Sequence, residues 1–247
     1  MKIVLSLLAI FLLSLAGQSR ASQELLLITD PFPPYNYEED GKAYGIQYEL
    51  VAATLKKMDR PFTIKFVPWK RALLKAKNKV SDALPGVLKT DERSQWLIFP
   101  EEPVMITKVV IFHRKEDNFQ YKNLSSLTGK RVGTVKGYYY GEEFDQSTLF
   151  IRDEVSSLKQ NFQKLIAGRI DLVVAFKPVG LYTLYKLNRS DKVSYNPTPV
   201  YQSGMYMAFT QKPGNEQLAA EFSRILKEIK KTPGYVKSLR KKYIPNE

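Results

Sequence analysis

Short apolar runs alternate with amphipathic stretches over residues 25–84. Leu25 to Ile28 is a continuous apolar run, which predicts a buried strand. Apolar positions at near-helical spacing follow Gly45 and predict a helix. Residues 62–67 alternate as a second strand, 72–79 form a second helix, and 82–84 form a third strand. This β-α-β-α-β order predicts a parallel sheet with helices on its faces.

The same order recurs in the second half of the chain. Strands are predicted over residues 131–135, 149–152 and 170–176, and a helix with an apolar stripe at Leu158, Phe162, Leu165 and Ile166 closes at Gly168. Two longer extended runs, Val104 to Phe112 and Gly204 to Phe209, read as connectors. We therefore predict an α/β fold with two lobes, each a mostly parallel sheet flanked by helices, joined by two hinge strands.

These patterns also set the predicted domain limits. Residues 22–110 form the first part of lobe 1, residues 111–206 form lobe 2, and residues 207–247 return to lobe 1 as C-terminal helices. Asn215 is predicted to cap the first of these helices, and Thr232-Pro233 to begin the last.

Three loops follow the three predicted strands of the first lobe. They contain Phe32 to Tyr37, Trp69 to Arg71, and Gly86 to Arg93. In parallel sheets, ligands bind beyond the carboxyl ends of the strands, so we expect these loops to converge on one site. Gly86 is expected at a backbone turn that approaches the ligand, and Arg93 offers a planar fork of donors for a carboxylate or phosphate.

The N-terminal residues read as an export signal. Lys2 supplies a positive charge, Ile3 to Leu15 form a short apolar core, and Ser19-Arg20-Ala21 gives a cleavage site. We predict a signal peptide over residues 1–21 and a soluble periplasmic product; an uncleaved anchor is the alternative. The chain has no cysteine, so disulfides, thiolate metal sites and a lipid-modified cysteine are excluded.

The chain has a net charge of +13. Its basic residues are scattered rather than interleaved with aromatic residues in a nucleic-acid-binding motif, and the densest cluster, Lys237 to Lys242, reads as a solvated helix face. The one histidine, His113, lies on a connector. We expect no nucleic acid, no metal and no cofactor, and a monomeric protein.

Several motifs occur in a characteristic order. They are Pro33-Pro34-Tyr35, Gly45, Asp82, Gly86 to Arg93 with Thr90-x-x-Arg93, Phe99-Pro100, Gly129-Lys130-Arg131-Val132-Gly133, Gly168-Arg169-Ile170-Asp171, and Gly234 with Lys242-Tyr243. Together they resemble the extracellular solute-binding proteins of the amino-acid type (family 3), the two-lobed receptors of ABC importers. The stretch Trp69 to Leu73 resembles a divergent branch of that family.

This resemblance implies a type II periplasmic-binding-protein fold that closes around a ligand by hinge bending. Arg93 matches the family arginine that pairs with the ligand carboxylate, while Thr90 fits the same loop or caps a short helix. Phe32 and Tyr35 lie near the stacking aromatic of the family, or in the core. The full set of candidate ligand-binding residues is Arg93, Thr90, Gly86, Leu88, Phe32, Tyr35, Trp69, Arg71, Tyr138, Tyr139 and Phe176.

Three departures from the family pattern bear on the ligand. Leu88 replaces a hydroxyl residue, Tyr138-Tyr139 replaces a small hydroxyl residue after Gly137, and Phe176 occupies the place of the acid that binds the α-ammonium. A buried ammonium without a carboxylate is strongly unfavourable. The sequence therefore favours a flat or apolar carboxylate, a modified amino acid or a short peptide over an ordinary α-amino acid.

Three functions remain open at this point. The first is a binding protein that delivers a small carboxylate-bearing solute to an ABC permease. The second is a sensor that binds a membrane signalling receptor in a conformation that depends on its ligand. The third is a dehydratase-like enzyme, which would need a poised acid in the cleft, for which Glu142 and Glu143 are the nearest candidates.

Overall fold

The computed structural model describes residues 24–244. The predicted signal peptide, residues 1–21, lies outside the described residues. Over residues 24–244, no helix has both the length and the apolar character needed to cross a bilayer.

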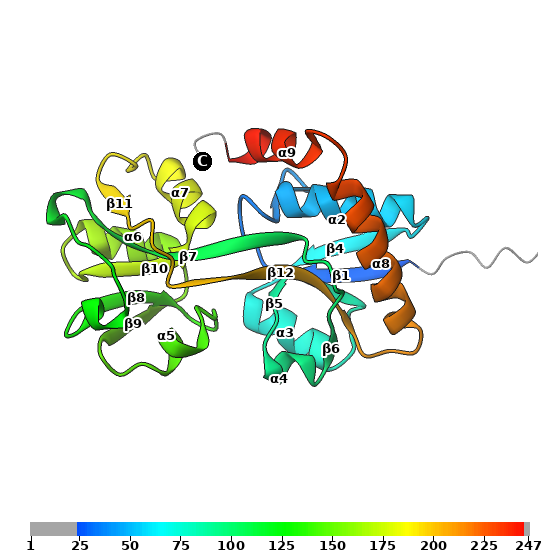
Figure 1. Cartoon of the computed structure of the whole chain (residues 1–247), viewed down its shortest axis with the longest axis horizontal. Helices are drawn as coiled ribbons and strands as arrows, with labels where there is room; N and C mark the ends of the chain where they lie inside the picture. The colour runs from blue at the N-terminus through cyan, green and yellow to red at the C-terminus, as the bar shows by residue number, and fades with distance from the viewer. Residues whose placement is uncertain (1–23, 245–247) are drawn as a thin grey trace, which may run out of the picture.

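The first lobe is built on three parallel strands (Figure 1). They are β1 (Leu25–Thr29), β4 (Phe62–Phe66) and β5 (Ala83–Leu88), and β1 pairs in parallel with both others. The connecting helices are α2 (Ile46–Lys57) and α3 (Trp69–Lys77). The predicted β-α-β-α-β order is confirmed here. The central strand β1 is almost wholly buried, whereas the edge strand β4 exposes alternate side chains to solvent.

The second lobe repeats the order. Its parallel strands are β8 (Arg131–Val135), β9 (Ile151–Val155) and β10 (Leu172–Phe176), with β8 between the other two. Its helices are α5 (Glu142–Gln146), α6 (Leu158–Ile166) and α7 (Lys177–Lys186). The strand predicted at 149–152 begins two residues later, and α7 has no counterpart among the predicted elements.

Two long strands cross between the lobes (Figure 1). They are β7 (Met105–Arg114) and β12 (Tyr201–Thr210), and they pair antiparallel with each other. The strand order β4-β1-β5-β12-β7-β10-β8-β9 makes one continuous sheet through both lobes. The two predicted connectors are these strands, and the two-lobed α/β fold is confirmed. The predicted domain limits after residues 110 and 206 fall inside β7 and β12, and we keep them as a proposed division.

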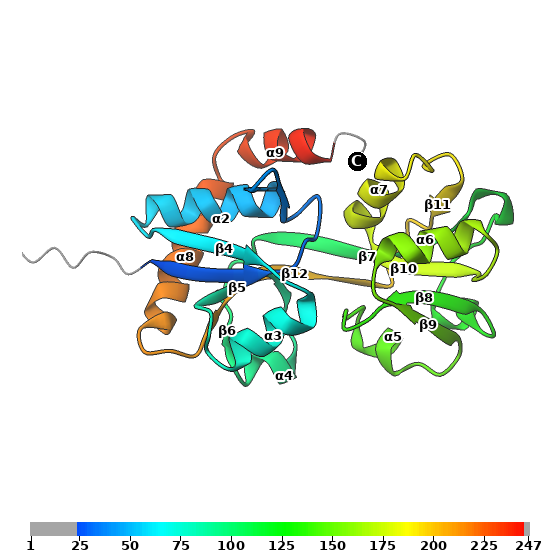
Figure 2. The same ribbon diagram turned by 180° about the vertical axis from the view of Figure 1, so that it is seen from behind.

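The C-terminal helices return to the first lobe, where α9 lies alongside α2 in both views (Figures 1 and 2). They are α8 (Asn215–Lys230) and α9 (Tyr235–Tyr243). Phe222 of α8 packs against Phe209 of β12, with ring centres 5.8 Å apart. The predicted cap at Asn215 is wrong: Gly214 precedes the helix, and the Asn215 side chain instead donates a hydrogen bond to the Thr210 carbonyl at 2.8 Å.

The remaining elements are short. They are β2 (Tyr37–Glu39), β3 (Lys42–Tyr44), α4 (Asp91–Ser94), β6 (Leu97–Ile98), two 3-10 turns at Lys115–Asp117 and Leu124–Leu127, and β11 (Val193–Tyr195).

The expected turn at Gly86 is also wrong. The strand β5 runs through Gly86, and the register of β12 against it shifts between Tyr206 and Met207. Gly86 has φ +89°, a conformation that favours glycine, and Pro85 before it has no N–H to give to the sheet. A bulge in a continuous strand, rather than a turn, therefore carries the chain from β5 towards Arg93.

Candidate ligand cleft

The loop after β1 is fixed by the start of α2. The N–H groups of Ile46 and Gln47 donate to the carbonyls of Pro34 and Tyr35 at 3.0 Å each, so the loop satisfies two backbone donors that a helix end leaves free. Gly45 makes this approach possible. A Cβ added there would lie 2.1 Å from the Tyr35 oxygen, and the residue has φ +122°.

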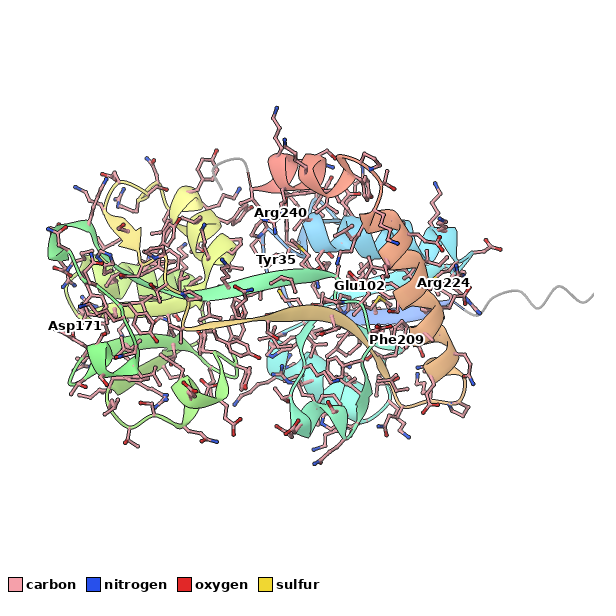
Figure 3. The ribbon with its side chains drawn as sticks, viewed as in Figure 1. Tyr35, Glu102, Asp171, Phe209, Arg224 and Arg240 are labelled. Carbon is pink, nitrogen blue, oxygen red and sulfur yellow. The ribbon has the colours of Figure 1, made fainter. Side chains whose placement is uncertain are left out.

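Tyr35 is therefore a core residue of this loop. Its side chain is fully buried, and its hydroxyl lies 3.0 Å from the Thr107 hydroxyl on β7, near which Figure 3 labels it. Its ring stacks on Phe32 at 5.6 Å, and Phe32 in turn faces the cleft. Of the two predicted aromatic residues in this loop, Phe32 lines the cleft and Tyr35 supports it from behind.

Arg93 is positioned by a capped helix. The Thr90 hydroxyl accepts a hydrogen bond from the Arg93 N–H at 3.2 Å and so caps α4. The Arg93 guanidinium folds back, donates to the Leu88 carbonyl at 2.9 Å, and lies 5.8 Å from the ring centre of Trp69. Thr90 thus serves as the helix cap and does not line the cleft.

Arg93 is a buried cation that forms no ion pair within residues 24–244, although Glu92 and Asp145 act on it from a greater distance. Its side chain is only 8% exposed, and no carboxylate of residues 24–244 forms an ion pair with it. Burial lowers the pKa of Arg93, because the charged form loses solvation. An arginine remains charged in proteins, so this site holds a desolvated positive charge that an anionic ligand would neutralise.

Aromatic side chains from both lobes meet opposite this cation. Phe32 of the first lobe contacts Tyr138 and Phe176 of the second edge to face, with ring centres 5.6 Å and 5.2 Å apart. Tyr138 and Phe176 contact each other at 6.2 Å. These rings form an aromatic wall across the division between the lobes, in the same cavity as Arg93.

Asp30 is an acidic residue in this cleft that the sequence interpretation did not single out. It follows β1 directly, and its carboxylate accepts a hydrogen bond from the Tyr138 hydroxyl at 3.1 Å, across the lobes. Burial raises the pKa of Asp30 to about 6, against the opposing effect of the Tyr138 hydrogen bond. Its place directly after a buried strand is the sequence signal that points to it.

Most of the predicted residues come together in one cavity. Its lining is Asp30, Phe32, Trp69, Gly86, Leu88, Arg93, Tyr138, Tyr139, Phe176 and Met205. Thr90, Tyr35 and Arg71 are the three predicted residues that lie outside it; Arg71 is exposed to solvent on α3. Asp30 and Met205 are the two lining residues that were not predicted. Gly86 contributes backbone, since a Cβ there would face the side chains of Gln47 and Asn36.

The Asp30 environment leads to a pH-dependent prediction. An acid whose pKa rises on folding binds its proton more tightly when folded, so stability increases as the pH falls from about 6 towards 3.8. At pH 7.5 the ionised form is unfavourable, and Asp30→Asn should raise the free energy of unfolding by on the order of 2 kcal/mol. At pH 4 the two proteins should be equally stable. Urea unfolding at both pH values measures this difference.

A matched control is Asp191→Asn, because Asp191 is exposed on the surface. Its effect should be small at both pH values. A difference between wild type and Asp30→Asn that stays constant from pH 4 to 7.5 would contradict the buried-acid interpretation.

The residues that hold a metal ion in proteins are not gathered in this cleft. Over residues 24–244 no three His, Cys, Asp or Glu side chains lie together in a way that would hold a metal. What the cleft does offer is a desolvated guanidinium, one carboxylate, and an aromatic wall. The guanidinium is chemically suited to pair with a carboxylate, and the Asp30 carboxylate with an amine.

The fold agrees with that of known proteins. A probable amino-acid-binding protein of Bacillus subtilis, YxeM, is 24% identical over 215 residues, which cover 85% of this chain and 79% of the relative. Among solved structures, an ancestral arginine-binding protein bound to arginine has a TM-score of 0.75 at 24% identity, covering 91% of this chain and 100% of its own. A histidine kinase sensor domain similar to periplasmic binding proteins reaches a TM-score of 0.78 at 23% identity, covering 91% of this chain and 97% of its own.

These structural likenesses show the fold, while the family follows from a match along the sequence. The model of the bacterial extracellular solute-binding proteins, family 3, matches residues 25–246, which is nearly the whole chain and includes every element that lines the cleft. This chain therefore belongs to the bacterial extracellular solute-binding proteins, family 3.

Proposed function

We propose that this protein captures a small carboxylate-bearing solute between its lobes and delivers it to an ABC permease. The observation that carries the proposal is Arg93, a buried cation without a carboxylate partner among residues 24–244, in a cavity lined from both lobes. The similarity to YxeM, a probable amino-acid-binding protein, supports an amino-acid-like ligand. The ligand classes that fit are a modified amino acid, a short peptide or an aromatic carboxylate.

The carboxylate of the ligand would pair with the Arg93 guanidinium, where the fork of donors allows two parallel hydrogen bonds. A ligand amine would approach Asp30, which replaces in function the acid that is absent at Phe176. The rings of Phe32, Tyr138 and Phe176 would pack on the apolar or flat part of the ligand. The remaining predicted ligand contacts are Trp69, Tyr139, Leu88 and the Gly86 backbone.

Native mass spectrometry of the gently purified protein, followed by a thermal-shift screen, tests this proposal. The screen contains amino acids, dipeptides and aromatic carboxylates. We expect a co-purified organic acid, or a raised melting temperature with one of these classes and none with the matching amides. Equal shifts for acids and amides would contradict a carboxylate anchor at Arg93.

We expect the protein to be a monomer outside the cytoplasm that binds its ligand without converting it chemically. Ligand recovered after long incubation should therefore have an unchanged mass. Loss of water or carbon dioxide from the recovered compound would instead support the dehydratase-like alternative.

A second candidate function is a sensor that reports its ligand to a membrane receptor. The similarity of the fold to a histidine kinase sensor domain supports this second candidate. Cross-linking of the ligand-bound protein in intact cells separates the two, since a permease partner supports import and a kinase or cyclase partner supports signalling.

A further inference from the structure

The cleft has two parts of very different size. The inner cavity beside Arg93 has a volume of about 30 Å³. A second cavity, the outer chamber, has a volume of about 610 Å³, and the two share Asp30, Phe32, Trp69 and Tyr138 in their walls. A ligand whose carboxylate is held at Arg93 would therefore extend past these four shared residues to reach the outer chamber.

Three lysines line the outer chamber. Lys70 comes from α3 in the first lobe, and Lys136 and Lys159 come from the end of β8 and the start of α6 in the second. None of the three forms an ion pair within residues 24–244. The only acidic residue in the chamber wall is Asp30, which already accepts the Tyr138 hydrogen bond.

Lys70 reaches across the cleft. A Cβ added to Gly137 would lie 3.2 Å from both the Cγ and the Cε of Lys70, so the lysine stem lies over the second-lobe backbone next to Lys136. Lobe closure thus brings like charges from both lobes together around one space. Like charges repel, and an anion between them would offset that repulsion.

We propose that this chamber is an outer subsite for a second anionic group, so that the protein prefers ligands with one carboxylate for Arg93 and another acidic group further out. This inference rests on the proposed function, because it places the outer group relative to the carboxylate held by Arg93. It narrows the ligand to compounds with two acidic groups, such as acidic dipeptides or acidic modified amino acids. The outer anion also favours the closed arrangement of the lobes.

The first test uses citrate as a probe of the chamber, with the full chain at low ionic strength and calorimetry as readout. Replacing all three lysines (Lys70→Gln, Lys136→Gln, Lys159→Gln) should weaken citrate binding at least about tenfold, because three charges that face the anion are lost. A control with the same change in net charge replaces the exposed lysines Lys77, Lys122 and Lys130 with glutamine. The control should bind citrate like wild type.

Two results would overturn the outer subsite. One is equal citrate affinity in both triple variants. The other is no citrate binding to wild type at 10 mM, which is about 50 times the concentration that half fills a site with a dissociation constant of about 0.2 mM. Both triple variants change only exposed side chains, so their melting temperatures should match that of wild type and serve as the check on folding.

The second test separates this inference from the function on which it rests. The dipeptides Glu-Ala, Gln-Ala and Lys-Ala share a C-terminal carboxylate and differ in the outer charge. Wild type should bind them in that order of decreasing affinity, and the chamber triple variant should bind all three alike. If Arg93→Ala loses dipeptide binding while the order survives in the triple variant, the proposed function stands and the outer subsite falls. If Arg93→Ala has no effect on the dipeptides, the carboxylate anchor itself fails.

Discussion

Arg93→Ala is expected to abolish ligand binding while leaving the free energy of unfolding almost unchanged. Among the residues that the structure describes, the guanidinium is the only cation in the wall of the inner cavity. A charged, bidentate pair with a carboxylate contributes about 3 kcal/mol, which corresponds to a loss of more than about 100-fold in affinity. Calorimetric titration of wild type and Arg93→Ala with the strongest binder from the thermal-shift screen measures this loss of affinity.

The free energy of unfolding should change little in Arg93→Ala, because the substitution both removes and adds stability in the unliganded protein. The substitution removes the hydrogen bond to the Leu88 carbonyl and the contact with Trp69, but it also relieves the desolvation of a buried charge that has no acidic partner among the described residues. We expect a change within about 1 kcal/mol. A large loss of stability would mean that Arg93 is a structural residue.

Arg71→Ala is the matched control. Arg71 lies on α3, is exposed, and is absent from the cavity wall. Its replacement should change affinity by less than about twofold, since an exposed charge outside the cavity contributes little. Arg93→Lys adds a second comparison: it keeps the charge but loses the planar fork, so it should recover only part of the affinity.

Gly45→Ala is expected to lower the free energy of unfolding by more than about 3 kcal/mol. A methyl group at this position would lie 2.1 Å from the Tyr35 oxygen and 2.5 Å from its carbonyl carbon, which are backbone atoms that no side-chain rotation can move aside. The positive φ of 122° adds strain for any residue with a Cβ. Chemical denaturation of wild type and variant measures the difference.

Gly41→Ala provides the control for this prediction. Gly41 also has a positive φ, +72°, but a Cβ there would meet no atom within 4 Å. Its replacement should therefore cost about 1 kcal/mol, from backbone conformation alone. Similar losses at the two positions would show that the close approach of Gly45 to Tyr35 is not what fixes the loop. The same displacement of the loop should also weaken ligand binding in Gly45→Ala, because Phe32 moves with it.

The amino-acid sequence predicted the fold well where each element leaves a local pattern. The apolar run that forms β1 and the alternation in β4 were sufficient to place the parallel strands, and the loops after them converge because parallel strands end at one edge. Eight of the eleven predicted residues line the cavity. The convergence of these loops predicted Phe32, Trp69, Gly86 and Arg93, whereas the resemblance to the family predicted Leu88, Tyr138, Tyr139 and Phe176.

The failures come from contacts that no local pattern records. Helix α7 contains Pro178 and Gly180, which read as breakers, yet Pro178 lies in its first turn and Gly180 is required because a Cβ would lie 2.2 Å from the Phe112 ring. Tyr35 and Phe32 are two aromatic residues in one loop, and only the tertiary structure shows which one faces the cleft. The bulge at Gly86 likewise depends on its pairing with β12, a strand more than 110 residues later.

The continuous sheet described above has a consequence for how the chain folds as it is made. β12 lies between β5 and β7 in the sheet, although it is the last strand in the sequence. During synthesis from the N-terminus, β5 therefore emerges long before its neighbour and presents an unpaired, mostly apolar edge until residues 201–210 appear. β7, β8 and β10 can pair earlier, because they are closer in sequence. The first-lobe half of the sheet is therefore synthesised first but completed last. A chaperone that shields the free edge of β5 during this interval would protect the strand that is most exposed to misassembly.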